Sequence, residues 1–239
     1  MIKITKKREP RKLLEYRRLP GASYENMDGH LKQIILEHLL EEQGHLCAYC
    51  MRRIPETRKL PAGVSGATIE HWFPRNPESK EDHGQGLDYK NMLAVCSGNR
   101  GCGDKRNLTC DAKRGNQQLT VNPCNTETLR SITYTSNGYI KSSNPIIDRD
   151  LNTYLNLNCE AISLPETRKQ VLNALIQDIR KHHPTGDIRQ YCQRKLNQIN
   201  NMDDIKIPFS GILIWWLDKH VKGAVAPKTA YALWQGFML

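Results

Sequence analysis

Apolar side chains recur at helical spacing near the start of the chain. Residues 28–43 place Leu31, Ile35 and Leu39 on one stripe, which is the pattern of a helix with one face in the core. Gly44 follows directly, and glycine is favoured there because helices commonly end on a residue with left-handed backbone angles. We therefore expect a helix that leads the chain into its first cysteine.

The same spacing returns in the second half of the chain. Residues 165–182 carry apolar side chains in helical register, namely Val171, Leu172, Leu175, Ile176 and Ile179. Asp187 is suited to cap a second helix, and Ser210 is suited to cap a third one over residues 211–221. We expect the chain to be mostly helical after about residue 145.

Between these parts the composition changes. Residues 51–90 are rich in proline, glycine and charge, which predicts loops with only a short strand around residues 67–72. Further on, the β-prone runs 129–135 and 139–141 flank Ser136-Asn137-Gly138. Asn-Gly between two such runs is a strong short-range signal for a hairpin. The whole pattern predicts an α+β protein that is mostly helical.

Length and composition exclude several classes of protein. With 239 residues, 38% of them hydrophobic and 25% charged, the chain is expected to be globular rather than fibrous or disordered. Its longest apolar run, 211–217, is far shorter than the roughly 20 residues that cross a bilayer, and the N-terminus is too charged for a signal peptide. We expect a cytoplasmic protein without a membrane partner. Its expected divisions are a basic arm and leading helix (1–44), a metal-centred module (45–125), and a hairpin and helical region (126–239).

Positive charge is concentrated at the N-terminus. The formal net charge is +10, and residues 1–20 carry eight Lys or Arg against two Glu. Such an arm can neutralise phosphates, which would make nucleic-acid binding sensitive to salt. A solvated tail is an equally good interpretation of the same charges. The cations of the arm are Lys3, Lys6, Lys7, Arg8, Arg11, Lys12, Arg17 and Arg18.

Six of the eight cysteines lie between residues 47 and 124. Because the cytosol keeps thiols reduced, such a cluster points to a metal rather than to disulfides. Cys47 and Cys50 form a Cys-x-x-Cys knuckle, whose thiolates can reach one tetrahedral ion from a single tight turn. Cys159 and Cys192 lie in apolar patterns and are expected to be small buried hydrophobic residues. The candidates for the second half of the site are Cys96, Cys102, Cys110 and, more distantly, Cys124.

Acidic, imidazole and amide side chains are interleaved with these cysteines. Glu70 and His71 are adjacent at the end of the short predicted strand, so one can bind a hard cation and the other can accept a proton. Asn91 precedes the next cysteine by five residues, and Asp111 directly follows a later cysteine. Each piece is a weak signal alone, but their order along the chain is a strong one.

This order resembles the HNH nuclease family, over roughly residues 45–125. Within that family the chain is most similar to the HNH proteins of Septu and retron anti-phage systems. The resemblance implies a zinc-stapled ββα-metal (HNH) module with a one-metal phosphodiesterase site. The motifs that carry it are Asn91-Met92-Leu93, Cys96, Cys110-Asp-Ala-Lys-Arg-Gly-Asn116, Asn122-Pro123 and the segment 147–158.

The resemblance also implies a role for each matching catalytic residue. His71 corresponds to the general base that deprotonates the attacking water. Asn91 corresponds to the residue that steadies the loop and the base. Glu70 and Asp111 correspond to the ligands of a catalytic divalent ion, and a carboxylate on the helix suits Mg²⁺ or Mn²⁺.

The implied structural Zn²⁺ has one ambiguous ligand. Cys110 is the preferred fourth ligand because the Asp-x-x-Arg-Gly of the family pattern follows it. Cys102 is the alternative, since Cys102-Gly-Asp-Lys-Arg imitates the same pattern and would move the metal carboxylate to Asp104. The implied zinc ligands are therefore Cys47, Cys50, Cys96 and Cys110, and the expected phosphate contacts are Arg75, Lys113 and Arg114.

The family further implies an endonuclease that acts as the effector of an anti-phage defence system. Its implied partners are a nucleic-acid substrate, an ATPase and, in retron versions, a reverse transcriptase with its RNA-linked DNA. We expect the ATPase contact in the helical region after residue 145 and at the aromatic end, 223–239, although such an end is also commonly docked on its own domain. The alternative is a zinc-ribbon adaptor that binds nucleic acid without cutting it, which leaves Glu70, His71 and Asp111 without a role. Neither DNA nor RNA is favoured as substrate.

Overall fold

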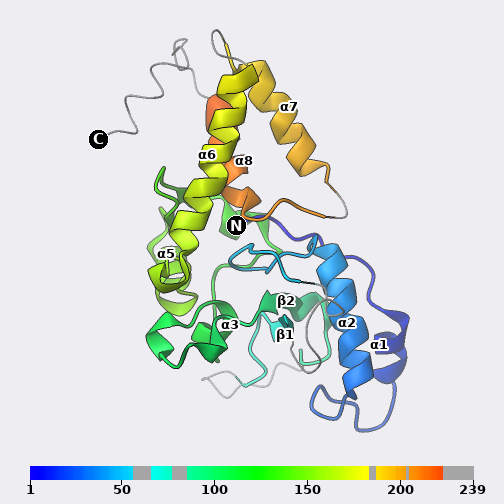
Figure 1. Ribbon diagram of the computed structural model, residues 1–239. Helices are drawn as coiled ribbons and strands as arrows, with labels where there is room; N and C mark the ends of the chain where they lie inside the picture. Colours follow the sequence, from blue (N-terminus) through cyan, green and yellow to red (C-terminus); the bar gives the residue numbers. More distant parts are fainter. Residues whose placement is uncertain (56–65, 77–84, 183–186, 203–204, 223–239) are drawn as a thin grey trace.

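The chain forms an α+β structure in which helices predominate over two small antiparallel sheets (Figure 1). The computed structural model describes residues 1–55, 66–76, 85–182, 187–202 and 205–222. The apolar end 223–239, one of the two expected sites of a partner contact, therefore lies outside the described residues. Within the described ones, no helix is both long enough and apolar enough to cross a membrane.

The elements follow the chain in an order of helices, a first strand pair, two short α-helices, a second strand pair and more helices. The strands are β1 (Ala67–His71), β2 (Met92–Cys96), β3 (Ile132–Tyr134) and β4 (Ile140–Ser142). The helices are α1 (Arg11–Tyr16), α2 (Gly29–Glu42), α3 (Cys110–Arg114), α4 (Thr126–Leu129), α5 (Pro145–Arg149), α6 (Leu164–His182), α7 (Arg189–Asn200) and α8 (Ser210–Lys222).

Helix α2 confirms the helix predicted over residues 28–43. The Asp28 side chain caps its start by accepting a hydrogen bond from the Leu31 backbone N–H at 2.9 Å. Gly44 follows the helix with a φ of 63°, as expected for a residue that ends a helix in the left-handed region. Leu31 and Leu39 are buried and hold the helix to the core.

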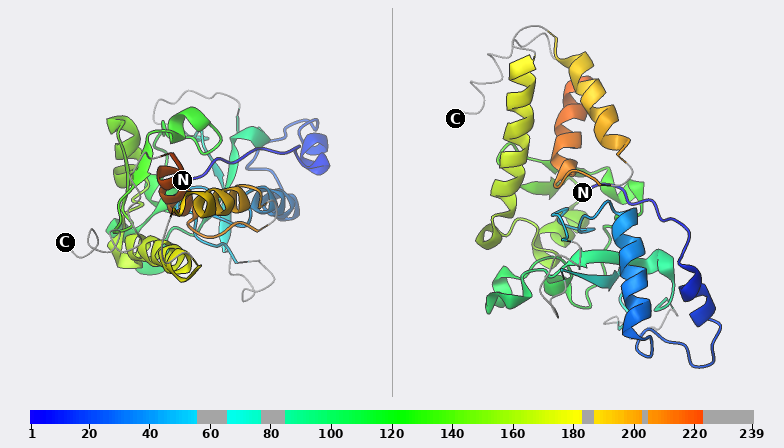
Figure 2. Two further views of the ribbon diagram at one scale, coloured as in Figure 1. Left: turned by 90° about the horizontal axis from the view of Figure 1, so that it is seen from above. Right: turned by 45° about the vertical axis from the view of Figure 1, so that its right-hand side comes forward.

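The β1–β2 pair forms the centre of the N-terminal half. The strands run antiparallel with Ala67 opposite Cys96 and Glu70 opposite Leu93. Every residue of β2 is buried, because α2 and α3 lie on either side of this sheet (Figures 1 and 2). The start of β1 thus lies beside the end of β2, and the end of β1 lies beside the start of β2. Helix α3 packs against β2.

The second half confirms the predicted hairpin and the three long helices. Strands β3 and β4 pair antiparallel, and Gly138 in their turn has a φ of 83°. Helix α8 packs against α6 and α7, and the three stand together away from the β1–β2 sheet (Figure 2). The Asp187 side chain accepts a hydrogen bond from the Arg189 N–H at 2.8 Å, but the capping residue of α7 is Ile188, whose side chain forms no capping hydrogen bond, so the cap predicted for Asp187 is wrong.

The cap predicted for α8 is wrong as well. Ser210 was expected to cap α8 from outside, but it is the first residue of the helix. Its hydroxyl is buried and makes no hydrogen bond within the part of the chain that the structure describes. The helix start is instead fixed by backbone bonds, such as that from the Ile212 N–H to the Phe209 carbonyl at 3.2 Å.

A single cluster of buried apolar residues runs through all three expected divisions of the chain. The N-terminal arm takes part in it: Leu13 is fully buried, and the Ile4 N–H donates to the Pro123 carbonyl at 2.8 Å. Cys159 and Cys192 are buried, as predicted for small hydrophobic residues. The division at residues 44 and 125 stays a prediction.

Candidate metal centre and active site

Four cysteines meet in the core beside the β1–β2 sheet. The sulfur atoms of Cys47, Cys50, Cys96 and Cys110 all lie within 4.8 Å of one another, and all four residues are buried. The Sγ–Sγ distance is 3.8 Å for the pairs Cys47–Cys110, Cys50–Cys96 and Cys96–Cys110. A tetrahedral ion with Zn–S bonds of about 2.3 Å separates its sulfurs by about 3.8 Å, whereas a disulfide requires about 2.05 Å. The donor set and its spacing therefore fit a tetrahedral metal ion such as Zn²⁺.

Three different elements supply these sulfurs. Cys47 and Cys50 lie on one tight turn, closed by a hydrogen bond from the Met51 N–H to the Cys47 carbonyl at 3.0 Å. The Ala48 N–H donates to the Ala94 carbonyl at 3.1 Å, which fastens this turn to β2. Cys96 is the last residue of β2 and Cys110 the first residue of α3. An ion at this point would tie the turn, the sheet and the helix together.

The competing ligand, Cys102, lies outside this cluster. It is exposed, and its Sγ donates to the Asp104 carbonyl oxygen at 3.0 Å. The Asp104 carboxylate is occupied by its neighbour Arg106, with an N–O distance of 3.0 Å. The loop between Cys96 and Cys110 thus carries Cys102 away from the sulfur cluster, and the chain rejoins the cluster at Cys110.

The thiols of the cluster share their charge unevenly. Hydrogen bonds with the other three thiols lower the pKa of Cys96, whereas the contacts of Cys110 with Cys47, Cys50 and Cys96 raise the pKa of Cys110. Burial raises the pKa of Cys47 well above its ordinary value. A divalent cation is the partner that lets four buried sulfurs ionise together.

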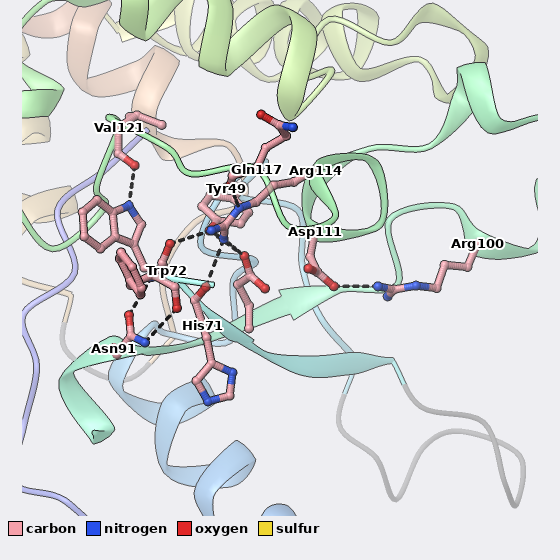
Figure 3. A network of polar contacts seen from close by, with 11 residues as sticks. Tyr49, His71, Trp72, Asn91, Arg100, Asp111, Arg114, Gln117 and Val121 are labelled. Carbon is pink, nitrogen blue, oxygen red and sulfur yellow. Dashed lines mark hydrogen bonds and ion pairs between the residues drawn. The ribbon is translucent and has the colours of Figure 1, made fainter. Parts of the chain in front are cut away.

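Arg114 occupies the space behind the strand end. Its guanidinium pairs with the Glu70 carboxylate and donates to the Tyr49 hydroxyl at 3.2 Å. It also donates to the carbonyls of His71 at 3.1 Å and Trp72 at 2.6 Å (Figure 3). Only 3% of the residue is exposed, so the phosphate contact expected of Arg114 is wrong for this structure: the side chain braces β1 from inside.

Two carboxylates lie next to each other at this strand end. The pKa of Glu70 is raised to about 8, chiefly because burial penalises its charge and further because the Asp111 carboxylate stands beside it, while Arg114 opposes the shift. The Oδ2 atom of Asp111 accepts a hydrogen bond from Arg100 at 2.6 Å (Figure 3). Each carboxylate is thus bound by one arginine, and β1 and α3 present them together.

The imidazole of His71 is held in one orientation. Its Nε2 atom lies 3.0 Å from the Gly86 carbonyl oxygen, and the Tyr24 ring packs edge-on with the ring centroids 4.6 Å apart. A carbonyl can only accept a hydrogen bond, so Nε2 carries the proton and Nδ1 carries the lone pair. Burial lowers the pKa of His71 to about 4. The ring is therefore neutral near neutral pH, and it lies on the far side of β1 from the Arg114 guanidinium (Figure 3).

Asn91 ties together the two segments that flank this imidazole. Its Oδ1 atom accepts from the Phe73 N–H at 2.7 Å, and its Nδ2 donates to the Phe73 carbonyl at 3.0 Å. The same Nδ2 lies 3.3 Å from the Gln85 carbonyl, one residue before the Gly86 carbonyl that contacts His71. Asn91 thus positions both the residues after β1 and the loop that orients the ring.

The two other expected phosphate contacts lie at the surface. Arg75 is exposed, pairs with Glu25, and places its guanidinium carbon 4.5 Å from the centre of the Tyr24 ring. Lys113 is partly exposed on α3. Sequence reasoning missed Tyr24, Tyr49 and Arg100 as neighbours of the site, because they belong to separate segments and no spacing rule connects them to Glu70 or Asp111.

The residues predicted for the site are therefore brought together in two groups. One is the four-sulfur cluster, which among the described residues is the only set of three or more His, Cys, Asp or Glu side chains close enough to share an ion. The other is the carboxylate pair of Glu70 and Asp111 on the Arg114 side of β1. The imidazole of His71 lies on the other side of the strand, where Asn91 positions the loop that orients it (Figure 3). Comparison with models of known protein families gives no match. Comparison with curated proteins gives none either.

Proposed function

We propose that the chain is a metal-dependent HNH endonuclease that hydrolyses phosphodiester bonds of nucleic acid. The observation that carries the proposal is the arrangement at the end of β1, where the Glu70 carboxylate meets that of Asp111 on α3. His71 follows Glu70 in the chain and carries a neutral, oriented imidazole on the other side of β1 (Figure 3). The order β1, β2, α3 along the chain agrees with the ββα-metal module that the family resemblance implies.

Glu70 and Asp111 are the residues that would hold the catalytic cation. Carboxylate oxygens are the ligands that Mg²⁺ and Mn²⁺ prefer, and sites for Mg²⁺ commonly use one or two carboxylates, with water and substrate phosphate completing the shell. When bound, such an ion stabilises the negative charge that grows on the phosphate and the leaving oxygen. Arg114 and Arg100 each contact one oxygen of their carboxylate partner, so each carboxylate keeps a second oxygen for the ion.

His71 is the general base of this proposal. The Gly86 carbonyl binds the protonated Nε2 atom, which leaves Nδ1 to accept a proton from the attacking water. Asn91 acts as a positioning residue, because it joins the Phe73 backbone to the loop that carries this carbonyl. Arg114 positions Glu70 and the His71 carbonyl with the same guanidinium.

The structural ion of the proposal is Zn²⁺, held by the four sulfurs that include Cys110. It fixes the start of α3, and therefore Asp111, relative to the end of β2. Structural zinc sites of this kind are closed four-sulfur shells that contribute folding energy rather than chemistry. In this role the zinc positions one ligand of the catalytic cation.

We further propose that the enzyme is the cytoplasmic effector of a Septu or retron type anti-phage system. The support for this is the motif resemblance, above all Asn91-Met92-Leu93 and the Cys-Asp-Ala-Lys-Arg-Gly-Asn run from Cys110. Its partners would be an ATPase and, in a retron system, a reverse transcriptase with its RNA-linked DNA. Helices α6, α7 and α8 stand apart from the candidate site (Figure 2), where such a partner can bind without blocking it.

Cleavage by the purified full chain tests the catalytic proposal. The probes are a circular single-stranded DNA, which has no ends, and a transcribed tRNA, each with added Mg²⁺ or Mn²⁺. We expect the wild type to cut at least one of them and the His71→Ala variant to cut neither while keeping its zinc. Equal cutting by the variant would reject His71 as the base. No metal-dependent cutting by the wild type, with binding retained in both proteins, would favour the non-catalytic adaptor.

A further inference from the structure

The N-terminal arm is fixed to the core rather than solvated. The Lys6 ammonium donates to the Glu42 carboxylate at 2.6 Å and to the Met92 carbonyl at 2.9 Å. The Lys7 backbone N–H donates to the other oxygen of Glu42 at 2.7 Å. Because Glu42 is buried at the end of α2, these bonds hold the arm beside the start of β2. The cations that follow Lys6 therefore have a defined place on the surface.

Two hollows lie between this arm and the loop that precedes β2. The first, of about 860 Å³, is lined by residues 7–9 and α1 on one side and by residues 88–90 on the other. The second, of about 610 Å³, is lined by residues 22–25, 73–76 and 85–88. Arg17 and Asp88 line both, so the two hollows adjoin each other, and together we call them the arm groove.

The arm groove is cationic. Three of its arginines are in ion pairs: Arg11 with Glu15, Arg17 with Glu9 and Arg75 with Glu25. Arg8 and Lys90, on opposite walls of the first hollow, are both exposed. The lining holds six cations, Lys7, Arg8, Arg11, Arg17, Arg75 and Lys90, against three carboxylates, Glu9, Glu25 and Asp88. Its excess of positive charge suits a polyanion with regularly spaced charges.

The second hollow ends at the candidate active site. Gly86, whose carbonyl orients His71, is part of its lining, and so is Tyr24, whose ring packs edge-on against the same imidazole. Phe73, which Asn91 positions, lines it as well. The hollow therefore offers aromatic surface beside the Arg75 guanidinium, at the point where the groove meets the imidazole.

We propose that the arm groove binds a single strand of nucleic acid and leads its backbone to His71. This inference rests on the proposed function, because it assigns the path of the substrate of that site. A cationic groove with aromatic side chains is the common arrangement for single strands, whose unstacked bases can pack on the rings. Each hollow has the volume of a site for one drug-sized ligand, about 300–1,000 Å³, which gives each room for about one nucleotide. The phosphodiester backbone, common to DNA and RNA, is the recognised chemistry.

The experiment measures binding apart from cleavage. All proteins carry His71→Ala, and the probe is a fluorescein-labelled oligothymidine of about 12 nucleotides. The groove variant adds Arg8→Ala and Lys90→Ala, which remove two exposed cations from opposite walls of the first hollow. The matched control adds Lys141→Ala and Lys181→Ala, which change the net charge equally at exposed positions far along the chain. Thermal melting of each protein checks that folding is retained.

The loss of two phosphate contacts has a calculable effect on the affinity for a single strand and on its salt dependence. Each contributes about −0.7 to the slope of log K against log salt for a single strand, so we expect the slope to become shallower by about 1.4 in the groove variant. At roughly 0.1 M salt this corresponds to about 25-fold weaker binding. The control is expected to keep the wild-type slope and to lose much less affinity. An equal loss in the control, or a duplex probe that binds as tightly and responds in the same way, would overturn the proposal.

A cleavage arm separates this inference from the proposed function. With His71 restored, we expect the groove substitutions to raise KM for a single-stranded substrate and to leave kcat nearly unchanged, because Arg8 and Lys90 line only the hollow farther from the imidazole. Cleavage by the wild type together with unchanged KM and binding in the groove variant would overturn the groove alone. Groove-dependent binding by a wild type that never cuts would reject the proposed function alone.

Discussion

Replacing Cys110 by serine removes one of the four sulfurs that surround the candidate zinc site. Cys110 lies 3.8 Å, sulfur to sulfur, from Cys47 and from Cys96, so no other thiol can take its place without moving the start of α3. Structural zinc supplies about 10–16 kcal/mol of binding free energy, and whole domains are stable by only about 5–15 kcal/mol. Losing the ion therefore removes free energy comparable to the entire stability of the fold.

The assay measures zinc per chain by mass spectrometry after dialysis against EDTA, together with urea unfolding followed by circular dichroism. We expect one zinc per wild-type chain, much less in Cys110→Ser, and an unfolding midpoint at lower urea for that variant. Cys102→Ser is the matched control, because this thiol is exposed and contacts only its own turn in the described structure. Zinc retained by Cys110→Ser and lost by Cys102→Ser would refute the ligand assignment, and a wild type without zinc would refute the site.

Two further predictions concern stability and are measured by chemical denaturation. Arg114→Met leaves the Glu70 carboxylate buried without its cation and should lower the free energy of unfolding by about 3–5 kcal/mol. The control Arg130→Met breaks an exposed pair and should lower it by about 1 kcal/mol or less. Similar losses in the two variants would contradict the bracing role of Arg114. Gly138→Ala would bring a Cβ to within 2.0 Å of the Pro165 carbonyl oxygen. The control is Gly21→Ala, where φ is also positive but an added Cβ meets no atom within 4 Å. Gly138→Ala should lower the free energy of unfolding by about 1–3 kcal/mol more than this control. Equal costs would show that the close approach to α6 does not matter.

The parts of the fold that the sequence predicts are those fixed by local signals. Helix α2 has its apolar stripe, the Asp28 cap and Gly44, and all three act within a few residues of the helix. The β3–β4 hairpin has an Asn-Gly turn between β-prone runs. Short elements such as α1 and α4 have no such pattern, since one turn of helix is too short to show a period and is stabilised by its surroundings.

The candidate site also contains features that the sequence predicts and features that it does not. Spacing alone identified the Cys47–Cys50 knuckle and left its partners open, and the family resemblance implied Cys96 and Cys110, which the structure brings together with the knuckle. The burial of Arg114 does not follow from spacing, because it depends on Glu70 and Tyr49, which lie 44 and 65 residues away in the chain. The sequence around an arginine next to a metal motif does not distinguish a side chain that binds phosphate from one that is buried in the core.

The N-terminal arm is a second example of this limit. Its charge allowed either a solvated tail or a phosphate-binding segment, and composition alone did not separate them. The structure shows a further division within the arm: Lys6 is used to fasten it to Glu42, 36 residues away, while Arg8 is left exposed. Only the partner residues, which come from α2 and β2, decide which cation has which role.

The central claim of this account is that Glu70 and Asp111 share a divalent ion next to His71 and beside a separate zinc site. Anomalous diffraction from crystals of the full chain soaked in Mn²⁺, recorded at the manganese and zinc edges, tests it most directly. The account predicts a zinc peak among the four sulfurs and a manganese peak between the two carboxylates, and the manganese peak should vanish in Glu70→Gln. Manganese bound elsewhere, or no manganese peak while the zinc peak is present, would contradict the claim.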